Sequence, residues 1–171
     1  HNRDHRSVQT GRRRRSIGSQ RALGRSNPSL GELDTTLVGL VDRVTRRLRD
    51  ADRLARTVVL RLRFSDFTRA TRSHTLVEST SHTDTILEAL RALLADAGPM
   101  IAERGITLLG VALTNLDDGD VTQLELPFGR RSGNALDEVL DDVRERFGGD
   151  ALGRAVMLGR DQGWSMPTLP E

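Results

Sequence analysis

Apolar and polar residues alternate along residues 57–64, which indicates a strand with one buried face and one basic face. The buried face holds Val58, Leu60, Leu62 and Phe64, and the other face holds Val59, Arg61 and Arg63. Three further segments are predicted to be strands, at 12–23, 73–78 and 106–114.

A helical spacing of apolar residues separates these strands in two places. Ser29 and Glu32 form an S-x-x-E capping box, which predicts the start of a helix that runs to about residue 52. Its apolar stripe is Leu33, Leu37, Leu40, Val41, Val44 and Leu48. A second helix is predicted from about Thr83 to Ala97, with Ile86, Leu87, Leu90, Leu93 and Leu94 on one face.

The resulting order β-α-β-β-α-β predicts an α+β fold of the split βαβ type over residues 12–116. Two helices would cover one face of a four-stranded antiparallel sheet. The other face would stay open and carry Arg61 and Arg63.

The remaining chain divides into a linker and a tail. Residues 115–120 are interpreted as a polar turn, and residues 117–133 as a linker. Residues 134–171 are predicted to form an acidic helical tail that begins at an Asn134 cap. Its apolar positions are Leu136, Val139, Leu140, Val143 and Phe147, and Asp137, Glu138, Asp141, Asp142 and Glu145 are placed on its outer side. The pattern leaves open whether the apolar side packs within the chain or on another protein.

Charge is distributed unevenly along the chain, although the formal net charge is only +2. Residues 1–110 contain 20 arginines and 12 acidic residues, whereas residues 111–171 contain 6 and 12. Every basic residue is arginine, which pairs with phosphate in a bidentate geometry. A basic body suggests a polyanionic partner, and an ordinary solvated surface is the alternative.

No set of residues indicates catalysis or a metal site. The chain has no cysteine, and its four histidines lack the spacing of metal ligands. No tyrosine is present and Phe64 belongs to the buried face, so the sheet offers almost no aromatic surface for stacking bases. Contact with the phosphates of a duplex is therefore favoured over contact with bases.

Several short stretches resemble the little finger, or polymerase-associated, domain of Y-family DNA polymerases. These are residues 14–18 (RRSIG), 60–67 (LRLRFSDF), 71–73 (TRS), 108–111 (LLGV) and 115–116 (NL). The similarity covers about residues 8–116 and is greatest to the bacterial DNA polymerase IV group. It implies that the open sheet grips primer–template duplex. The DNA-binding residues that the resemblance implies are Arg14, Arg15, Ser16, Gly18, Arg69, Thr71, Arg72 and Ser73. Strand alternation adds Arg61 and Arg63. A bulge near Asp66 would decide whether Arg61 and Arg63, or Arg69 and Arg72, face the DNA.

Residues 123–128 (QLELPF) resemble the Q-x-x-L-x-F peptide by which bacterial polymerases bind the sliding β clamp. In that interpretation Gln123 supplies hydrogen bonds while Leu126 and Phe128 fill an apolar pocket, together with Leu124 and Pro127. The alternative is that Phe128 is a satellite of the core.

The resemblance also carries expectations about the whole protein. Residues 1–11 would be the linker from a thumb domain, and the polymerase active site with its Mg²⁺ ions would lie outside this chain. The fragment itself is expected to be a monomer with no cofactor and no membrane partner, located in the cytoplasm with the nucleoid. A stand-alone nucleic-acid adaptor, including one for RNA, and a protein–protein interaction module remain as alternatives.

Overall fold

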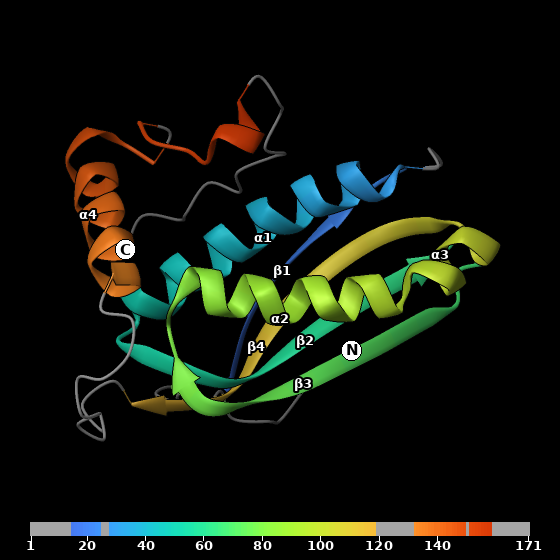
Figure 1. Cartoon of the computed structure of the whole chain (residues 1–171), viewed down its shortest axis with the longest axis horizontal. Coiled ribbons are helices and arrows are strands. Elements are labelled where there is room, and N and C mark those ends of the chain that lie inside the picture. Colours follow the sequence, from blue (N-terminus) through green and yellow to red (C-terminus); the bar gives the residue numbers. More distant parts are fainter. Residues whose placement is uncertain (1–14, 25–27, 119–131, 150, 159–171) are drawn as a thin grey trace, which may run out of the picture.

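The computed structural model describes residues 15–24, 28–118, 132–149 and 151–158 (Figure 1). Its elements follow one another in the order β1 Ser16–Ala22, α1 Leu30–Asp50, β2 Arg53–Phe64, β3 Arg69–Thr80, α2 Thr83–Asp96, α3 Gly98–Arg104, β4 Ile106–Asp118, α4 Ser132–Phe147 and the 3₁₀ turn η1 Ala155–Met157.

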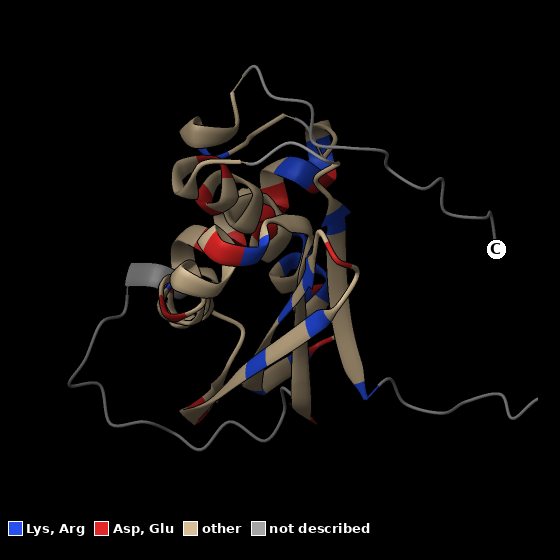
Figure 2. Cartoon of the chain, turned by 90° about the vertical axis from the view of Figure 1, so that its right-hand side faces the viewer, with Lys and Arg blue, Asp and Glu red and all other residues tan. Residues whose placement is uncertain are grey.

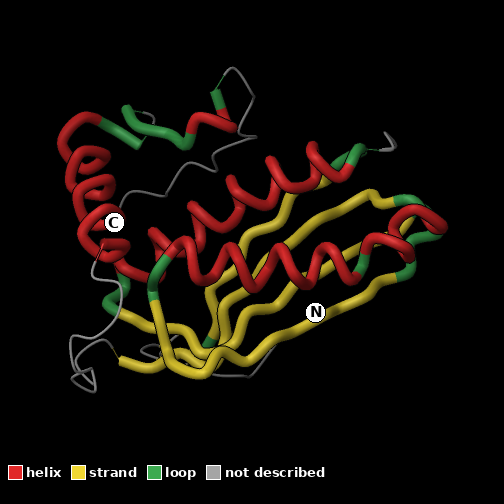
Figure 3. Tube along the Cα trace, viewed as in Figure 1, coloured by secondary structure: helices red, strands yellow, loops and turns green. Residues whose placement is uncertain are grey.

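The four strands form one antiparallel sheet in the order β1-β4-β2-β3. Since β1 and β2 both pair antiparallel with β4, they run parallel to each other on either side of it. This is the predicted split βαβ arrangement, and it is confirmed. Helices α1 and α2 lie side by side on one face of the sheet (Figures 1 and 3), and no helix in the described part of the chain lies over the opposite face.

The core lies between the two helices and the sheet. The predicted stripe of α1 is buried, as are the alternating apolar residues of β2 from Val58 to Phe64. The capping box at the start of α1 is present: the Glu32 amide donates to Ser29 Oγ at 3.3 Å, and the Ser29 amide donates to Glu32 Oε2 at 2.8 Å. Local sequence thus sets the helix start, and the stripe of α1 sets which side it buries.

Strand β4 extends four residues beyond its predicted end, so the prediction of a turn at residues 115–118 is wrong. Long-range contacts explain the extension, because Arg53 Nη2 donates to Leu116 O at 2.7 Å and Arg53 Nε donates to Asp117 O at 3.0 Å. The same guanidinium forms an ion pair with Asp118 at 3.3 Å. The predicted linker of 117–133 is correspondingly shorter, because β4 ends at Asp118 and α4 begins at Ser132.

Helix α4 is oriented differently from the pattern-based expectation. Asp137 and Arg144 are buried against the rest of the molecule, and Asp141 is half-buried, whereas Leu136, Val139 and Phe147 are exposed. The placement of Asp137 and Asp141 on the outer side is therefore wrong. The helix packs through polar side chains, whose partners lie in distant parts of the chain.

Candidate nucleic-acid interface

The strand register defines which side chains share the open face of the sheet. Residues directly opposite each other on paired strands point to the same face. Four rows therefore cross the face from β1 through β4 and β2 to β3. They are Ser16, Thr114, Thr57 and Thr75; Gly18, Ala112, Val59 and Ser73; Gln20, Gly110, Arg61 and Thr71; and Ala22, Leu108, Arg63 and Arg69.

The arginines of this face cluster towards one end. Arg61 lies in the third row, and Arg63 and Arg69 lie opposite each other in the fourth, next to the turn between β2 and β3. Figure 2 shows Arg segments along the strands and most acidic segments among the helices. The four rows contain no acidic residue. Within the described residues, neither Arg61 nor Arg69 takes part in an ion pair, so their charges face solvent.

In the middle of the open face, small residues project little above the backbone of the sheet. A side chain added at Gly18 would place its Cβ 3.1 Å from the Val111 carbonyl oxygen, and one added at Gly110 would lie 3.1 Å from Gln20 Cβ. Both contacts are tighter than ordinary van der Waals packing. With Ala112 and Ser73 nearby, Gly18 and Gly110 leave a shallow surface next to the Arg61 side chain. A phosphate backbone can approach such a surface closely.

Arg63 is oriented by a neighbouring strand. Its Nε donates to Thr107 Oγ1 at 3.1 Å, at the point where the register between β2 and β4 shifts. The guanidinium is therefore held in place while part of its donor set remains available.

Arg72 lies on the opposite face from Arg61, Arg63 and Arg69. It pairs with Leu60, whose side chain belongs to the core, and its own side chain extends into solvent from the edge strand β3. The register divides the second of the two pairs that the sequence offered: Arg69 shares the open face with Arg61 and Arg63, and Arg72 does not. Thr71 and Ser73 share the open face with them.

Other predicted DNA-binding residues lie at the start of β1. Ser16 and Gly18 are exposed on the open face, and Arg15 is exposed just before it. Arg14 lies outside the described residues.

Gln20 and the pair Thr57 and Thr75 also belong to this face, and sequence analysis missed them. Alternation from Ser16 and Gly18 would have found Gln20, since strand residues two apart share a face.

The turn between β2 and β3 is built around Asp66. Its Oδ1 accepts from the Thr68 amide at 3.0 Å and from the Thr68 hydroxyl at 2.6 Å, and its Oδ2 accepts from Arg104 Nη2 at 2.7 Å. Hydrogen bonds from Thr68 and Arg104 lower the pKa of Asp66 to about 2. The Arg104 guanidinium also lies over the Phe64 ring, 4.4 Å from its centroid. These contacts fix the end of the sheet where the arginines gather.

The clamp-binding residues predicted from the sequence, Gln123, Leu124, Leu126, Pro127 and Phe128, lie outside the described residues. Among the residues that are described, no three His, Asp or Glu side chains form a group able to hold a metal ion. In the same ranges, no helix is long and apolar enough to cross a bilayer.

Comparison with known proteins shows which family and which solved structures this chain is similar to. Residues 14–126 match the impB/mucB/samB family C-terminal domain. DNA polymerase IV 2 of Mesorhizobium japonicum is 38% identical over 168 residues, which are 89% of this chain and 40% of that protein. The structure of DinB from Sulfolobus solfataricus shares the fold, with a TM-score of 0.53 and 12% identity over 60% of this chain and 29% of that one. A complex of beta-clamp processivity factor and the little finger domain of PolIV aligns with 67% of this chain and 99% of that one, with a TM-score of 0.49 and 21% identity. The chain thus spans less than half the length of the curated relative.

Proposed function

The chain belongs to the impB/mucB/samB family, whose C-terminal domain, the little finger of Y-family polymerases, it carries at residues 14–126, and from this membership we propose that its open sheet grips duplex DNA for a translesion DNA polymerase. The observation that carries the proposal is the open face itself, which combines Arg61, Arg63 and Arg69 with small and hydroxyl residues and no carboxylate. Such a face neutralises phosphates and does not repel them.

The mode of binding follows from the residue types on the face. Arginine forks and hydroxyl groups bond to phosphate oxygens, and these contacts position a duplex without reading its sequence. No aromatic residue occurs in the four rows, so base stacking contributes nothing there. Binding without sequence preference suits a polymerase that must follow any template.

The proposal extends to the whole protein from which this domain comes. Polymerisation and the Mg²⁺ ions that support it are assigned to the parts of the polypeptide that this chain does not contain. The present domain would contribute grip on primer–template duplex near the nucleoid. Residues 123–128 would attach it to the sliding β clamp through the apolar side chains of Leu126 and Phe128. Burying each such side chain contributes about 1.5–3 kcal/mol, and after ordering costs a peptide of this kind binds at about micromolar affinity.

The DNA-binding proposal is tested by removing the charges of the open face. We expect the triple variant Arg61→Gln/Arg63→Gln/Arg69→Gln to bind a short duplex about 10- to 100-fold more weakly at low salt. Each lost phosphate contact reduces the slope of log K against log salt by about 0.9. Fluorescence anisotropy across a salt series measures both quantities.

Arg72→Gln is the matched control, because it removes an exposed arginine from the same hairpin but from the other face of the sheet. Its affinity and salt slope should stay close to those of the parent chain. An equal loss per charge removed in the control and the triple variant would show that general charge, not this face, binds the duplex. A preference for single strands would favour the RNA or adaptor alternative.

A further inference from the structure

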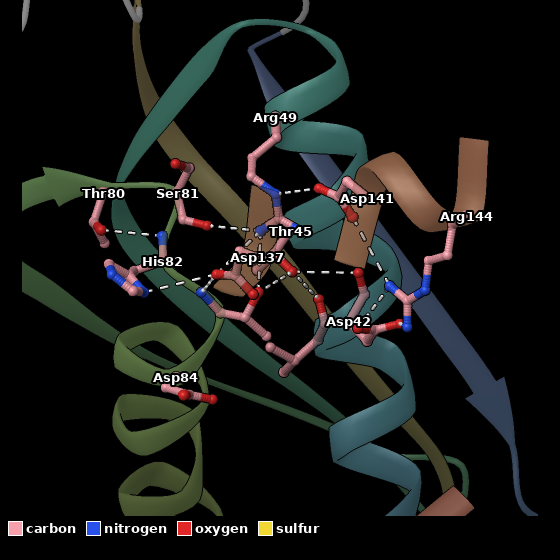
Figure 4. A network of polar contacts seen from close by, with 12 residues as sticks. Asp42, Thr45, Arg49, Thr80, Ser81, His82, Asp84, Asp137, Asp141 and Arg144 are labelled. Carbon is pink, nitrogen blue, oxygen red and sulfur yellow. Dashed lines mark hydrogen bonds and ion pairs between the residues drawn. The ribbon is translucent and has the colours of Figure 1, made fainter. Parts of the chain in front are cut away.

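Two phenylalanines are exposed in the described part of the chain, and only one of them adjoins the open face. Phe67 is 71% exposed, and Phe147, the last residue of α4, is 75% exposed. Polar contacts hold α4 on the helical layer (Figure 4): Asp137 Oδ2 accepts from the Thr83 amide of α2 at 2.9 Å, and Arg144 forms an ion pair with α1 at 3.0 Å. Phe147 therefore belongs to the helical layer, whereas Phe67 lies in the turn between β2 and β3.

The backbone at Phe67 has the conformation that glycine ordinarily adopts in such a turn. The Phe67 amide donates to the Phe64 carbonyl at 3.0 Å, and the Phe64 amide donates to the Thr68 carbonyl at 2.9 Å. Phe67 has a φ of 63°. A hairpin built from a β-turn and one following left-handed residue usually has glycine or asparagine there, because a bulky side chain is strained at positive φ. Phenylalanine at this position therefore costs conformational energy that glycine would not.

Packing of the ring does not offset this strain. The side chains that pack against the core, within the described residues, do not include Phe67. The backbone on both sides of it is nevertheless fixed, because Asp66 Oδ1 accepts from the Thr68 amide at 3.0 Å. A strained residue whose side chain is held outward without a contact in the fold is typical of a functional position.

The arginines of the open face lie next to this ring. Arg69 follows Phe67 by two residues, so their Cα atoms are at most about 7 Å apart. Arg63 lies directly opposite Arg69 on the neighbouring strand. Proteins hold single-stranded nucleic acid by the same combination, in which basic groups neutralise the phosphates and an aromatic ring stacks on a base.

Acidic side chains near the turn leave this preference for an anionic partner in place. The Asp66 carboxylate is paired with Arg104 at 2.7 Å, which offsets its charge. Glu103 is exposed on α3, but Ile101 buries that helix in the core on the helical layer (Figure 1). The arginines of the open face are therefore the charges nearest to the ring that have no acidic partner in the strand register.

The stacking partner of such a ring is an unpaired base. Inside a duplex the flat faces of the bases are covered by their neighbours, and only an unpaired nucleotide can offer a face to a side chain. A polymerase works where the primer ends and the template continues as a single strand. Its DNA therefore supplies unpaired nucleotides directly beside a duplex.

We propose that Phe67 is a stacking site for an unpaired template nucleotide next to the duplex that the open face binds; this inference rests on the proposed function. The ring contacts the base, while Arg69 and Arg63 contact phosphates of the same strand. The site accepts any base, because every base has a π face. The left-handed backbone keeps the ring directed away from the core.

The inference is tested by fluorescence anisotropy of the full chain with three DNAs that share one duplex. The first is blunt, the second has a single-stranded extension, and the third has an extension of the same length made of abasic nucleotides. We expect the parent chain to bind the extension with bases about 10-fold more tightly than the abasic one, which is the size of one base–aromatic contact. Phe67→Asn should lose this preference. The two extensions carry the same phosphates, so the comparison isolates the bases.

Phe147→Asn is the matched control, because it removes an equally exposed phenylalanine from the helical layer. It should keep the preference for the extension with bases. Asparagine tolerates positive φ, so Phe67→Asn should unfold at the same temperature as the parent or at a higher one. A lower unfolding temperature would show that the ring supports the fold, and it would refute the assigned role.

The blunt duplex separates this inference from the proposed function. If the parent chain binds none of the three DNAs, both proposals fail. If it binds the blunt duplex but shows no preference for bases in the extension, or if Phe67→Asn keeps that preference, the stacking site is refuted and duplex binding stands. Self-association of the parent chain in sedimentation, abolished by Phe67→Asn, would assign the ring to a protein contact and also refute the stacking site.

Discussion

Asp66 is a single residue on which the end of the basic face depends. Hydrogen bonds from Thr68 and then from Arg104 stabilise its carboxylate and lower its pKa from 3.8 to about 2. Because the pKa is lower in the folded chain, the stabilisation is present above pH 3.8. It is lost as the pH falls towards 2 and the carboxylate becomes protonated.

We therefore expect the Thr68 amide resonance to titrate with a midpoint near pH 2, since this amide donates to Asp66 Oδ1. Asp66→Asn should remove that titration and reduce the loss of thermal stability between pH 4 and pH 2. NMR and thermal unfolding across this range provide the measurement. An unchanged Thr68 titration in the variant would assign the effect to another group.

At the scale of the element, α4 is a helix that docks through charge. Its buried contacts come from Asp137 and Arg144, which bond to α2 and α1 respectively. Removing one partner of a buried, hydrogen-bonded pair costs more than the pair contributes, because the other partner is left unsatisfied. The docking of α4 is thus sensitive to single polar substitutions, unlike the packing of α1.

Asp137→Ala should weaken the docking of α4 by about 1–3 kcal/mol, since the Thr83 amide loses its acceptor and Arg49 loses an ion-pair partner. Hydrogen exchange is expected to accelerate along α4 while the amides of β2 keep their protection. Asp142→Ala, five residues further along α4 and exposed, is the control and should leave α4 unchanged. Equal acceleration in both variants would mean that helix propensity, not docking, is responsible.

At the scale of the whole molecule, the arginines of the open face lie on the other side of the sheet from the acidic side chains of α4. The open face of the sheet carries Arg61, Arg63 and Arg69, whereas α4 packs on the helical layer through contacts with α1 and α2. A packed layer is about 10 Å thick, and the Debye length is about 8 Å at physiological salt. The charges of Glu138, Asp142 and Glu145 on α4 are therefore largely screened from the open face of the sheet.

Glu138→Gln/Asp142→Gln/Glu145→Gln should consequently change the affinity for duplex less than about 2-fold at physiological salt. Fluorescence anisotropy with a short duplex measures this affinity. A several-fold gain in DNA affinity would show that the acidic tail competes with DNA.

Local pattern determined much of this protein. Three features depend only on neighbours within a few residues: the alternation in β2, the apolar stripe of α1 and the capping box at Ser29. The strands, the helices and their split βαβ order could therefore be predicted from the sequence. The residues of α4 also predicted a helix, because a 3.6-residue period is local.

Only the tertiary structure decided how these elements face one another. Arg72 lies off the open face because cross-strand register, not spacing along β3, sets its side. The end of β4 depends on Arg53, more than sixty residues away, and the orientation of α4 on Arg49 and Asp42, about a hundred residues away. Partners so distant in sequence leave no periodic signal, and their energies appear only once the chain has brought them together.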